Sequence, residues 1–253
     1  MNIKDVTIGE GQPKVVVSFT GHTPEEIRAE IAEARTNSDK FDIVEIRSDS
    51  FDAMNHEDHF AVVDHISREM GDYPIIYTYR TNGEGGNGTK SAAEYQSLLS
   101  HAIDHSEIDI VDIEFFMYEE IVDQLVARAK EKGVAVLLSQ HDFRDTPHFE
   151  DMMATYKNMY ERGGDILKLA YQPADGRDVL SVLSAVHDAR RKFNCQVVGI
   201  AMGEAGKITR VAGGVFGSCL TYGHLVNQAA PGQINAGILK EYLNIFEEEG
   251  LGH

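Results

Sequence analysis

The feature of this sequence that most restricts its fold is a run of apolar, β-branched residues that recurs eight times. Helical stretches separate the runs, so successive runs have the strand–helix–strand order that builds parallel sheets. The runs are Lys14–Phe19, Phe41–Arg47, Pro74–Arg80, Ile108–Glu114, Val134–His141, Ile166–Ala170, Gln196–Met202 and Gly214–Cys219. Eight such units predict an α/β chain folded as a parallel eight-stranded barrel, for which about 250 residues is a common length.

The residues before the first run predict a small additional element. Ile3, Val6 and Ile8 are apolar residues among polar ones, and a Gly9–Gly11 turn follows them. We expect a short N-terminal β-hairpin that closes the lower end of the barrel. No linker rich in proline and serine divides the chain, so residues 1–253 are expected to form a single barrel domain.

Composition excludes some classes of function. The formal net charge of −18 argues against a nucleic-acid partner, which would need a basic face. A small anionic ligand remains compatible, because salt screens charges beyond about 10 Å and a local arginine cluster can still attract it. Cys195 and Cys219 lie in apolar segments and are expected to be buried thiols in a reducing compartment. Without a membrane-spanning run or an apolar signal core, we expect a cytoplasmic protein and no membrane partner.

Five of the eight runs end in polar or charged residues. One such residue alone would only mark the exit of a strand into solvent. The carboxyl ends of parallel barrel strands meet on one face, however, and barrel enzymes carry their active sites there. Five strands that end this way therefore favour a functional site. The residues are Glu45, Arg47, Asp49, Arg80, Asp112, Glu114, Ser139, His141 and Lys168.

Two of these residues suggest covalent chemistry. Lys168 stands between Leu167 and Leu169 in the sixth run. It is either a lysine that extends out of the strand end or a Schiff-base nucleophile, whose pKa burial and nearby cations would lower. His141 is either a hydrogen-bonded rim residue or a general base beside that lysine. No spacing of His, Cys and carboxylates resembles a metal site, so no metal is expected.

Two glycine-containing segments follow the third and seventh runs. Residues 83–90 have neither the spacing of a P-loop nor that of a dinucleotide-binding motif, so we interpret them as a flexible loop. Glu84 in this loop lies close behind Arg80 and could reach the site. After the seventh run, Arg210 is suited to bind a carboxylate or phosphate, although it could also begin a surface helix.

The ordered set of motifs resembles the type I 3-dehydroquinate dehydratase family. The resemblance extends from the first strand to residue 233, nearly the whole chain. It implies a (β/α)₈ TIM barrel in the shikimate route to aromatic compounds, usually a homodimer, with no metal and no organic cofactor. The motifs are Val15–Phe19, Glu45-x-Arg47-x-Asp49, Arg80 with the Glu84-Gly-Gly loop, Asp112-x-Glu114, Ser139-x-His141-Asp-Phe143, Lys168 and Ala230-Pro-Gly-Gln233.

The resemblance also implies roles for individual residues. Lys168 would condense with the C3 ketone of the small-molecule substrate, 3-dehydroquinate. His141 would remove the C2 proton and later protonate the departing C1 hydroxyl, with Glu84 supporting it. Glu45, Arg47 and Arg80 would bind the ring hydroxyls of the substrate, and Ser18 would also belong to the binding site. Met202 would pack against the ring, and Arg210 and Gln233 would bind the carboxylate.

Two positions depart from the family pattern, and two other functions are alternatives. Ala229 stands where a serine commonly contacts the carboxylate, and Tyr222 stands where phenylalanine is usual. One alternative is a class I aldolase, which also carries a Schiff-base lysine on the sixth strand of a barrel but would need a phosphate cradle near Arg210. The other is a non-catalytic barrel that binds a small anion. The sequence does not distinguish a biosynthetic role from a catabolic one.

Overall fold

Eight parallel strands form the centre of the computed structural model, which describes residues 1–115 and 119–248. They are β3 Lys14–Phe19, β4 Ile43–Arg47, β5 Ile75–Thr78, β6 Ile110–Glu114, β7 Ala135–Asp142, β8 Ile166–Tyr171, β9 Gln196–Ala201 and β10 Leu220–His224. Each of the first seven strands overlaps the corresponding apolar run, although the bounds differ by one or two residues at most ends. The sequence pattern therefore predicted these strands correctly.

The expected eighth strand, Gly214–Cys219, is wrong. The first half of this stretch belongs to a 3₁₀ helix, η3 Gly213–Phe216, and the strand begins at Leu220. Gly217 has φ of 101°, a left-handed conformation that ends the helix and that no strand adopts. The backbone N–H groups of Gly217 and Ser218 donate to the carbonyl oxygens of Gly214 and Gly213, which close the turn. The glycines therefore outweigh the apolar character of this run.

The strands follow one another around a curled sheet. The order is β11-β10-β3-β4-β5-β6-β7-β8-β9, with every pair parallel, and β11 is the short strand Ile234–Asn235 beside β10. A single parallel bridge, Val197 to Ser218, connects β9 to the residues before β10. The N–H of Cys219 donates to the carbonyl of Val197 at 2.9 Å. These contacts bring the two ends of the sheet together, so the chain is a (β/α)₈ barrel.

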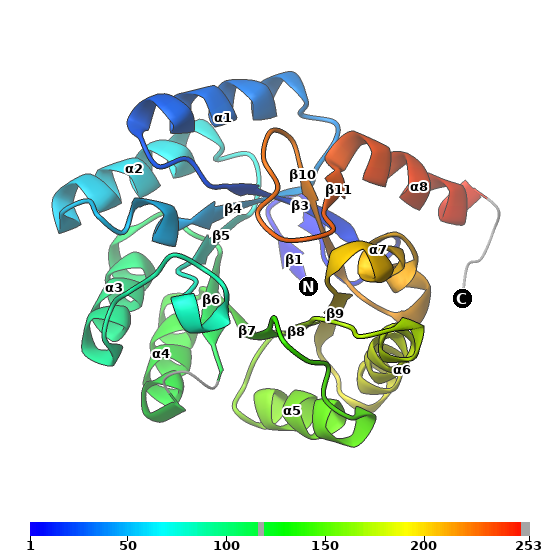
Figure 1. Ribbon diagram of the computed structural model, residues 1–253. Helices are drawn as coiled ribbons and strands as arrows, with labels where there is room; N and C mark the ends of the chain where they lie inside the picture. The colour runs from blue at the N-terminus through cyan, green and yellow to red at the C-terminus, as the bar shows by residue number, and fades with distance from the viewer. Residues whose placement is uncertain (116–118, 249–253) are drawn as a thin grey trace.

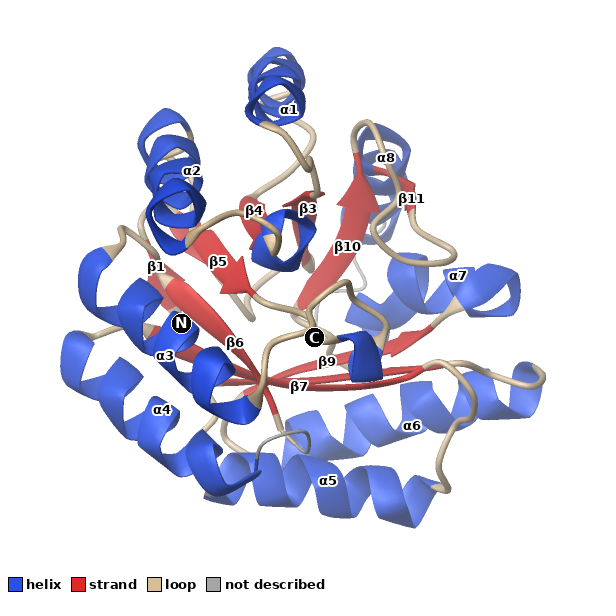
Figure 2. Cartoon of the chain, turned by 60° about the vertical axis from the view of Figure 1, so that its left-hand side comes forward, coloured by secondary structure: helices blue, strands red, loops and turns tan. Residues whose placement is uncertain are grey.

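Eight helices surround the strands (Figures 1 and 2). Several begin at residues with side chains suited to their ends: Thr23 caps the first helix, which has proline at its start, and Ser91 forms a capping box with Glu94. The helices are α1 Pro24–Thr36, α2 His56–Glu69, α3 Ala92–His105, α4 Glu119–Lys132, α5 Phe149–Glu161, α6 Gly176–Lys192, α7 Gly203–Ala212 and α8 Ala236–Glu248.

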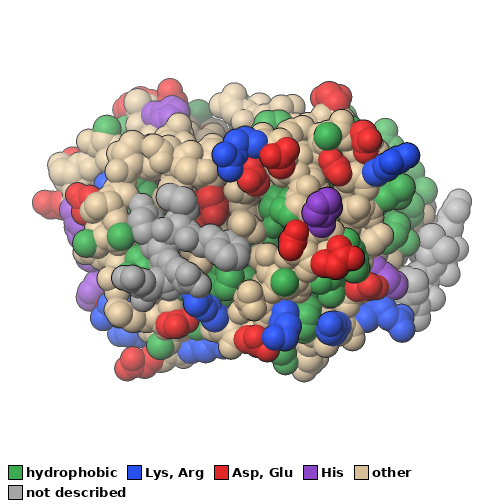
Figure 3. Space-filling view, turned by 60° about the horizontal axis from the view of Figure 1, so that its bottom comes forward, with side chains coloured by type: hydrophobic (Ala, Val, Ile, Leu, Met, Phe, Trp, Pro, Cys, Tyr) green, Lys and Arg blue, Asp and Glu red, His purple; other side chains and the backbone are tan. Residues whose placement is uncertain are grey.

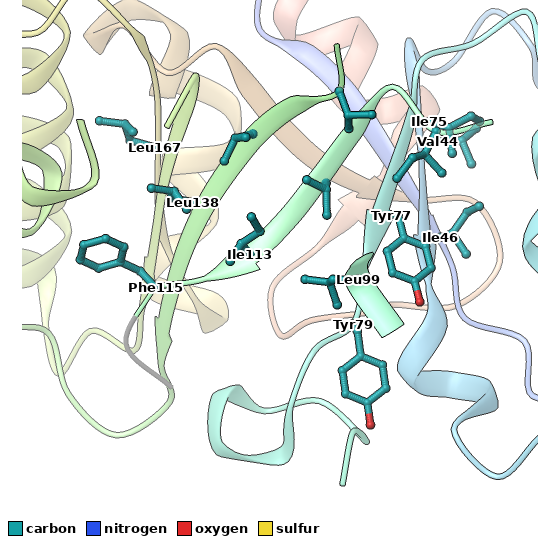
Figure 4. Close-up of a cluster of buried hydrophobic side chains, with 14 of the residues drawn as sticks. Val44, Ile46, Ile75, Tyr77, Tyr79, Leu99, Ile113, Phe115, Leu138 and Leu167 are labelled. Carbon is teal, nitrogen blue, oxygen red and sulfur yellow. The ribbon is translucent and has the colours of Figure 1, made fainter. Parts of the chain in front are cut away.

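The outer face of the barrel is the larger apolar core. Alternate residues of each strand point outward and pack against the helices, as Val44, Ile46, Tyr77 and Ile113 do in Figure 4. These side chains are fully buried. On the surface, acidic and basic side chains are interspersed over the face seen in Figure 3.

The interior of the barrel is built in layers. In the lower layer every strand contributes one buried apolar side chain: Val16, Ile43, Ile76, Ile110, Leu137, Ile166, Val198 and Leu220. Below it, the predicted N-terminal hairpin is present, with β1 Asn2–Ile3 paired antiparallel to β2 Val6–Thr7. Met1, Ile3 and Val6 pack against the lower layer, and Ile8 is fully buried within it. The hairpin thus closes the lower end, and any ligand has to enter from the other end.

Candidate active site

The next layer of the interior is mostly polar. Side chains on one face of a strand repeat every two residues, so the residues two positions beyond the apolar layer also point inward. They are Ser18, Glu45, Thr78, Asp112, Ser139, Lys168, Ile200 and Tyr222. Seven of these eight, all but Ile200, carry a group that can donate or accept hydrogen bonds. All but Ser18 are buried. The barrel therefore changes from an apolar floor to a polar site within two residues.

A single cavity at the carboxyl ends of the strands is lined by all ten residues to which the family resemblance gave a role. Asp49, Asp112, Glu114 and Ser139, which the sequence also placed at the strand ends, are not among its lining residues. Six further residues with side chains, and one glycine, complete its wall. The predicted residues are Ser18, Glu45, Arg47, Arg80, Glu84, His141, Lys168, Met202, Arg210 and Gln233, and the others are Gly85, Phe143, Ala170, Ile200, Tyr222, Ala229 and Ala230. Segments that are far apart in the sequence thus meet at one place.

Lys168 lies on β8 near the centre of this cavity and is 4% exposed. Its Nζ is 3.8 Å from Asp112 Oδ2 and 4.2 Å from the centre of the Tyr222 ring. Burial lowers the pKa of Lys168, the carboxylates of Asp112 and Glu45 oppose this effect, and the cations of Arg80 and Arg47 reinforce it. The result is an amine that loses its proton more readily than an exposed lysine and is therefore better able to act as a nucleophile.

His141 is held by Glu84. Its Nδ1 lies 2.8 Å from Glu84 Oε2, and the backbone N–H of His141 donates to the same oxygen at 3.1 Å. Burial, Arg80 and Lys168 lower the pKa of His141 well below its usual value, so the imidazole is neutral near pH 7. With Nδ1–H directed at Glu84, the Nε2 atom carries the free lone pair that a general base needs.

The loop after β5 places Glu84 at the site. A 3₁₀ turn, η2 Asn82–Glu84, is followed by Gly85 with φ of 81°. A Cβ atom on Gly85 would lie 2.2 Å from the Phe143 ring, so a side chain at this position would displace Phe143 from the cavity wall. Glycine thus shapes the loop so that Glu84 contacts His141. The sequence predicted that Glu84 could reach the site, but it indicated only a flexible loop and not this fixed turn.

Arg80 is the centre of a buried ionic network. Its Nη2 donates to Asp112 Oδ2 at 2.6 Å, and its Nη1 lies 3.0 Å from Glu114 Oε1 and 3.3 Å from Glu84 Oε2. Ser139 Oγ accepts from Arg80 at 2.9 Å and donates to Asp112 at 2.6 Å. Three carboxylates raise the pKa of Arg80 well above its usual value, although burial opposes them. Arg80 therefore holds the acids of the site in place as well as lining the cavity.

Glu45 and Arg47 lie on β4 opposite Lys168, and each has a polar neighbour. Ser18 donates to Glu45 Oε2 at 2.5 Å, and Thr78 donates to Glu45 Oε1 at 2.9 Å. Arg47 donates from Nε and Nη2 to the two oxygens of Asp49, at 2.9 and 3.0 Å. Both side chains are thereby fixed in position on the cavity wall, and their remaining hydrogen-bonding capacity is available to a polyhydroxylated ligand.

Arg210, near the end of α7, is a buried cation without an ionic partner among the described residues. Nη2 donates to the Pro231 carbonyl at 3.0 Å and Nη1 to the Tyr222 carbonyl at 3.3 Å, whereas Nε has no partner in that part of the chain. Burial lowers the pKa of Arg210 to about 10. A buried cation that lines a cavity and lacks a counter-ion is suited to bind an anion there.

The loop that connects β10 to β11 passes over the cavity (Figure 1). Its residue Gln233 is 3% exposed, and Gln233 Oε1 accepts from the backbone N–H of Ala229 at 2.8 Å. Pro231 accepts from Arg210 and also from the backbone N–H of Gly203 at 3.3 Å. Polar contacts thus connect this loop to Arg210 and Gly203.

Within residues 1–115 and 119–248, no group of three or more His, Cys, Asp and Glu side chains is arranged to hold a metal ion. In the same part of the chain, none of the helices has the length and apolar character needed to cross a membrane.

Comparison with known proteins gives a family for this site. The family model for type I 3-dehydroquinase matches residues 15–249. The chain belongs to the type I 3-dehydroquinase family. A 3-dehydroquinate dehydratase from Enterococcus faecalis is 36% identical over 248 residues, which cover 97% of each chain. The type I 3-dehydroquinate dehydratase from Clostridium difficile, solved with covalent modified comenic acid, has a TM-score of 0.93 at 32% identity and covers 98% of each chain.

More distant structures share only the barrel with this type I 3-dehydroquinase. The 3-hexulose-6-phosphate synthase from Salmonella typhimurium has a TM-score of 0.59 at 16% identity over 92% of this chain. Such a likeness shows the fold alone.

Sequence reasoning did not assign a role to Asp112, to Tyr222 or to the apolar wall residues Ala170 and Ile200. Asp112 is two residues beyond the inward-facing Ile110 on the same strand, so its side chain also points into the barrel. Its contact with Lys168 depends on how the neighbouring strands are placed. For Tyr222 the signal was hidden, because the eighth strand was placed six residues too early.

Proposed function

We propose that this type I 3-dehydroquinase converts 3-dehydroquinate to 3-dehydroshikimate through a Schiff base on Lys168. The observation that carries the proposal is the pairing of two groups in one cavity: a buried lysine with a lowered pKa, and a partly buried, neutral histidine oriented by Glu84. The family match favours this reaction over an aldolase. The covalent modified comenic acid of the Clostridium difficile relative supports covalent chemistry.

The first half of the reaction makes the C2 proton acidic. The Lys168 amine adds to the C3 carbonyl, a C–N bond forms, and the carbonyl oxygen leaves as water after taking one proton from the amine and one from a general acid. The nitrogen becomes a cationic iminium, which can accept the electron pair of the adjacent C–H bond. Nε2 of His141 then takes the C2 proton, and an enamine forms.

The second half expels the C1 hydroxyl. The enamine returns its electron pair, the C1–O bond breaks, and the proton on His141 goes to the departing hydroxide to give water. Addition of water to the iminium finally releases the conjugated ketone and restores the Lys168 amine. Glu84 keeps the same hydrogen bond to Nδ1 throughout, which stabilises the imidazolium formed between the two proton transfers.

Substrate orientation would come from the remaining residues of the cavity. Arg210 offers its unpaired Nε to the carboxylate, and the amide of Gln233 approaches from the loop. Glu45, Arg47, Arg80 and Ser18 would bind ring hydroxyls, and Met202, 1% exposed, would pack on the ring. Because Arg80 and Ser18 already have carboxylate partners, they would act partly by fixing Glu84 and Glu45.

The proposed activity is tested by incubating the protein with 3-dehydroquinate and following the ultraviolet absorbance of the conjugated product. Lys168→Ala and Lys168→Arg are the matched controls, since both remove the nucleophile and the second keeps the charge. We expect turnover by the unaltered protein and none by either variant. Binding of 3-dehydroquinate without turnover by the unaltered protein would mean a non-catalytic barrel.

We also propose that the chain acts as one cytoplasmic catalytic domain and forms a homodimer through α7 and α8. Helices α7 and α8 pack against each other and expose Ile208, Ile238, Tyr242 and Ile245, and η3, which contacts α7, exposes Val215; each is between 42% and 53% exposed. Single exposed apolar residues are normal, but five on neighbouring helices favour an interface. With both copies at −18, association has to rest on apolar contact, which this patch supplies.

The dimer is tested by light scattering on the unaltered protein and on the double variant Ile238→Asp, Ile245→Asp. Leu180→Asp on α6, a 63% exposed apolar residue outside the patch, is the control. The proposal predicts a dimer that the double variant alone dissociates, whereas a monomer, or a dimer insensitive to these changes, would contradict it.

A further inference from the structure

Asp112 has no function in the mechanism above, although it lies at the centre of the barrel. It is 1% exposed and its carboxylate is held on three sides. Oδ2 is 2.6 Å from Arg80 Nη2 and 3.8 Å from Lys168 Nζ, and Oδ1 accepts from Ser139 at 2.6 Å. The position of this carboxylate is therefore fixed before any substrate arrives.

The partners of Arg80 and Lys168 differ in number. Arg80 contacts Glu84 and Glu114 in addition to Asp112. Lys168, in contrast, forms an ion pair with Asp112 alone among the acids in the described part of the chain. Removing Asp112 would leave Arg80 with two carboxylates and Lys168 with none in contact.

We propose that Asp112 is a positioning residue that serves as the counter-ion of the Schiff-base nitrogen. The inference rests on the proposed function, because it requires the covalent bond to Lys168. When that bond forms, the neutral amine becomes an iminium, which carries a fixed positive charge on the same Nζ atom. Asp112 lies about one ion-pair distance away and is already oriented by Arg80 and Ser139, so no reorganisation is needed to stabilise the charge.

This position makes Asp112 act in opposite directions on two steps. In the free enzyme Asp112 opposes the effect of burial and raises the pKa of Lys168, so it keeps part of the amine protonated. After condensation the same carboxylate stabilises the iminium. Without Asp112, the amine should be available at lower pH, yet the intermediate should be less stable. A residue that only supported the fold would not produce this pair of effects.

Glu114 provides the matched control. It also accepts from Arg80, at 3.0 Å, and its other oxygen accepts from Thr81 at 2.7 Å. No ion pair connects it to Lys168 within the described residues, and its charge is not one of the larger influences on the pKa of the lysine. Asp112→Asn and Glu114→Gln both remove one negative charge from Arg80 and retain side-chain shape, but only the first removes a charge next to Lys168.

The experiment measures the rate of adduct formation between enzyme and 3-dehydroquinate as a function of pH, stopped with borohydride and read by intact mass, together with kcat. For Asp112→Asn we expect the pH midpoint of adduct formation to fall by about 1 pH unit, since one opposite charge shifts a pKa by about 1–3 units. We expect its kcat to fall by at least about 10-fold. One pKa unit corresponds to a tenfold change in an equilibrium constant, and the equilibrium affected here is the formation of the iminium. Glu114→Gln should leave the midpoint in place.

The outcomes separate the two proposals. If the unaltered enzyme forms no adduct, the Schiff-base function is wrong. If the unaltered enzyme forms the adduct but the Asp112→Asn midpoint stays in place, or moves equally in Glu114→Gln, Asp112 only holds Arg80 and the inference is overturned. Asp112→Ser is the second variant should Asp112→Asn not fold, and the same shift is expected of it.

Discussion

Replacing Arg210 by methionine should separate stability from function. The side chain is 2% exposed, and burial lowers its pKa from the ordinary value of an arginine to about 10. At about 1.4 kcal/mol per pKa unit, this corresponds to a cost of about 3 kcal/mol for burying the charge. Below pH 10 the arginine is charged in both the folded and the unfolded chain, so the whole cost applies at neutral pH.

Two effects on stability nearly cancel in Arg210→Met. The variant avoids the cost of the buried charge but loses the hydrogen bonds to the carbonyls of Tyr222 and Pro231. Hydrogen bonds from a charged group contribute about 1.5 kcal/mol or more each, so about 3 kcal/mol is lost. We expect the free energy of unfolding to change by no more than about 1.5 kcal/mol. Arg80→Met, which removes the arginine cation that three buried carboxylates share, should lose at least about 3–5 kcal/mol.

The effect of Arg210→Met on catalysis should be large. If Nε binds the substrate carboxylate, its loss removes about 1.5–3 kcal/mol of binding, which is about 10- to 150-fold in kcat/KM. The assays are urea unfolding of both variants, product formation in the ultraviolet, and the shift in melting temperature on adding 3-dehydroshikimate. The reasoning fails if Arg210→Met is as destabilised as Arg80→Met, or if the product still raises its melting temperature as it does for the unaltered enzyme.

Three further predictions follow from the same site. His141→Ala should still form the adduct but turn over about 10²–10⁴-fold more slowly, and near-normal kcat would remove this histidine from the role of base. Residues 227–233 should exchange amide hydrogens faster in the free enzyme than with product bound, because the loop would close over bound product. Ala229→Ser should lower KM, and Gln233→Ala should raise it. Equal exchange in the two states and unchanged KM values would mean that the loop only connects two elements. Tyr222→Phe removes a buried hydroxyl that has no hydrogen-bond partner among the described residues, so the melting temperature of the free enzyme should stay the same or rise; a clear decrease would show that the hydroxyl is satisfied in solution.

The sequence was sufficient for most of the barrel because the physical signals are local. The apolar, β-branched character of a run depends on that run alone, so it located seven strands, and the polar ends of the runs indicated Glu45 and Lys168 as site residues. The argument from apolar character failed at Gly214–Cys219, where glycine conformation outweighed it. The N-terminal hairpin could be expected because its apolar residues needed a surface on which to be buried.

The ionic contacts of the site could not be read in this way. Arg80 was expected to bind substrate, yet its guanidinium also contacts Glu84, Glu114 and Asp112, which come from a loop and a neighbouring strand. Which acid pairs with which base depends on distances across the barrel, and these are set by the stagger between strands and by the glycine loop that carries Glu84. Sequence identifies the members of such a network but not its pairings.

The central claim is that Lys168 is the nucleophile, and covalent trapping tests it most directly. The protein is incubated with 3-dehydroquinate and borohydride, its intact mass is measured, and the modified peptide is sequenced by mass spectrometry. The account predicts one reduced adduct per chain, located on Lys168 and absent from Lys168→Ala. Turnover of 3-dehydroquinate without any adduct, or an adduct on another lysine, would contradict it.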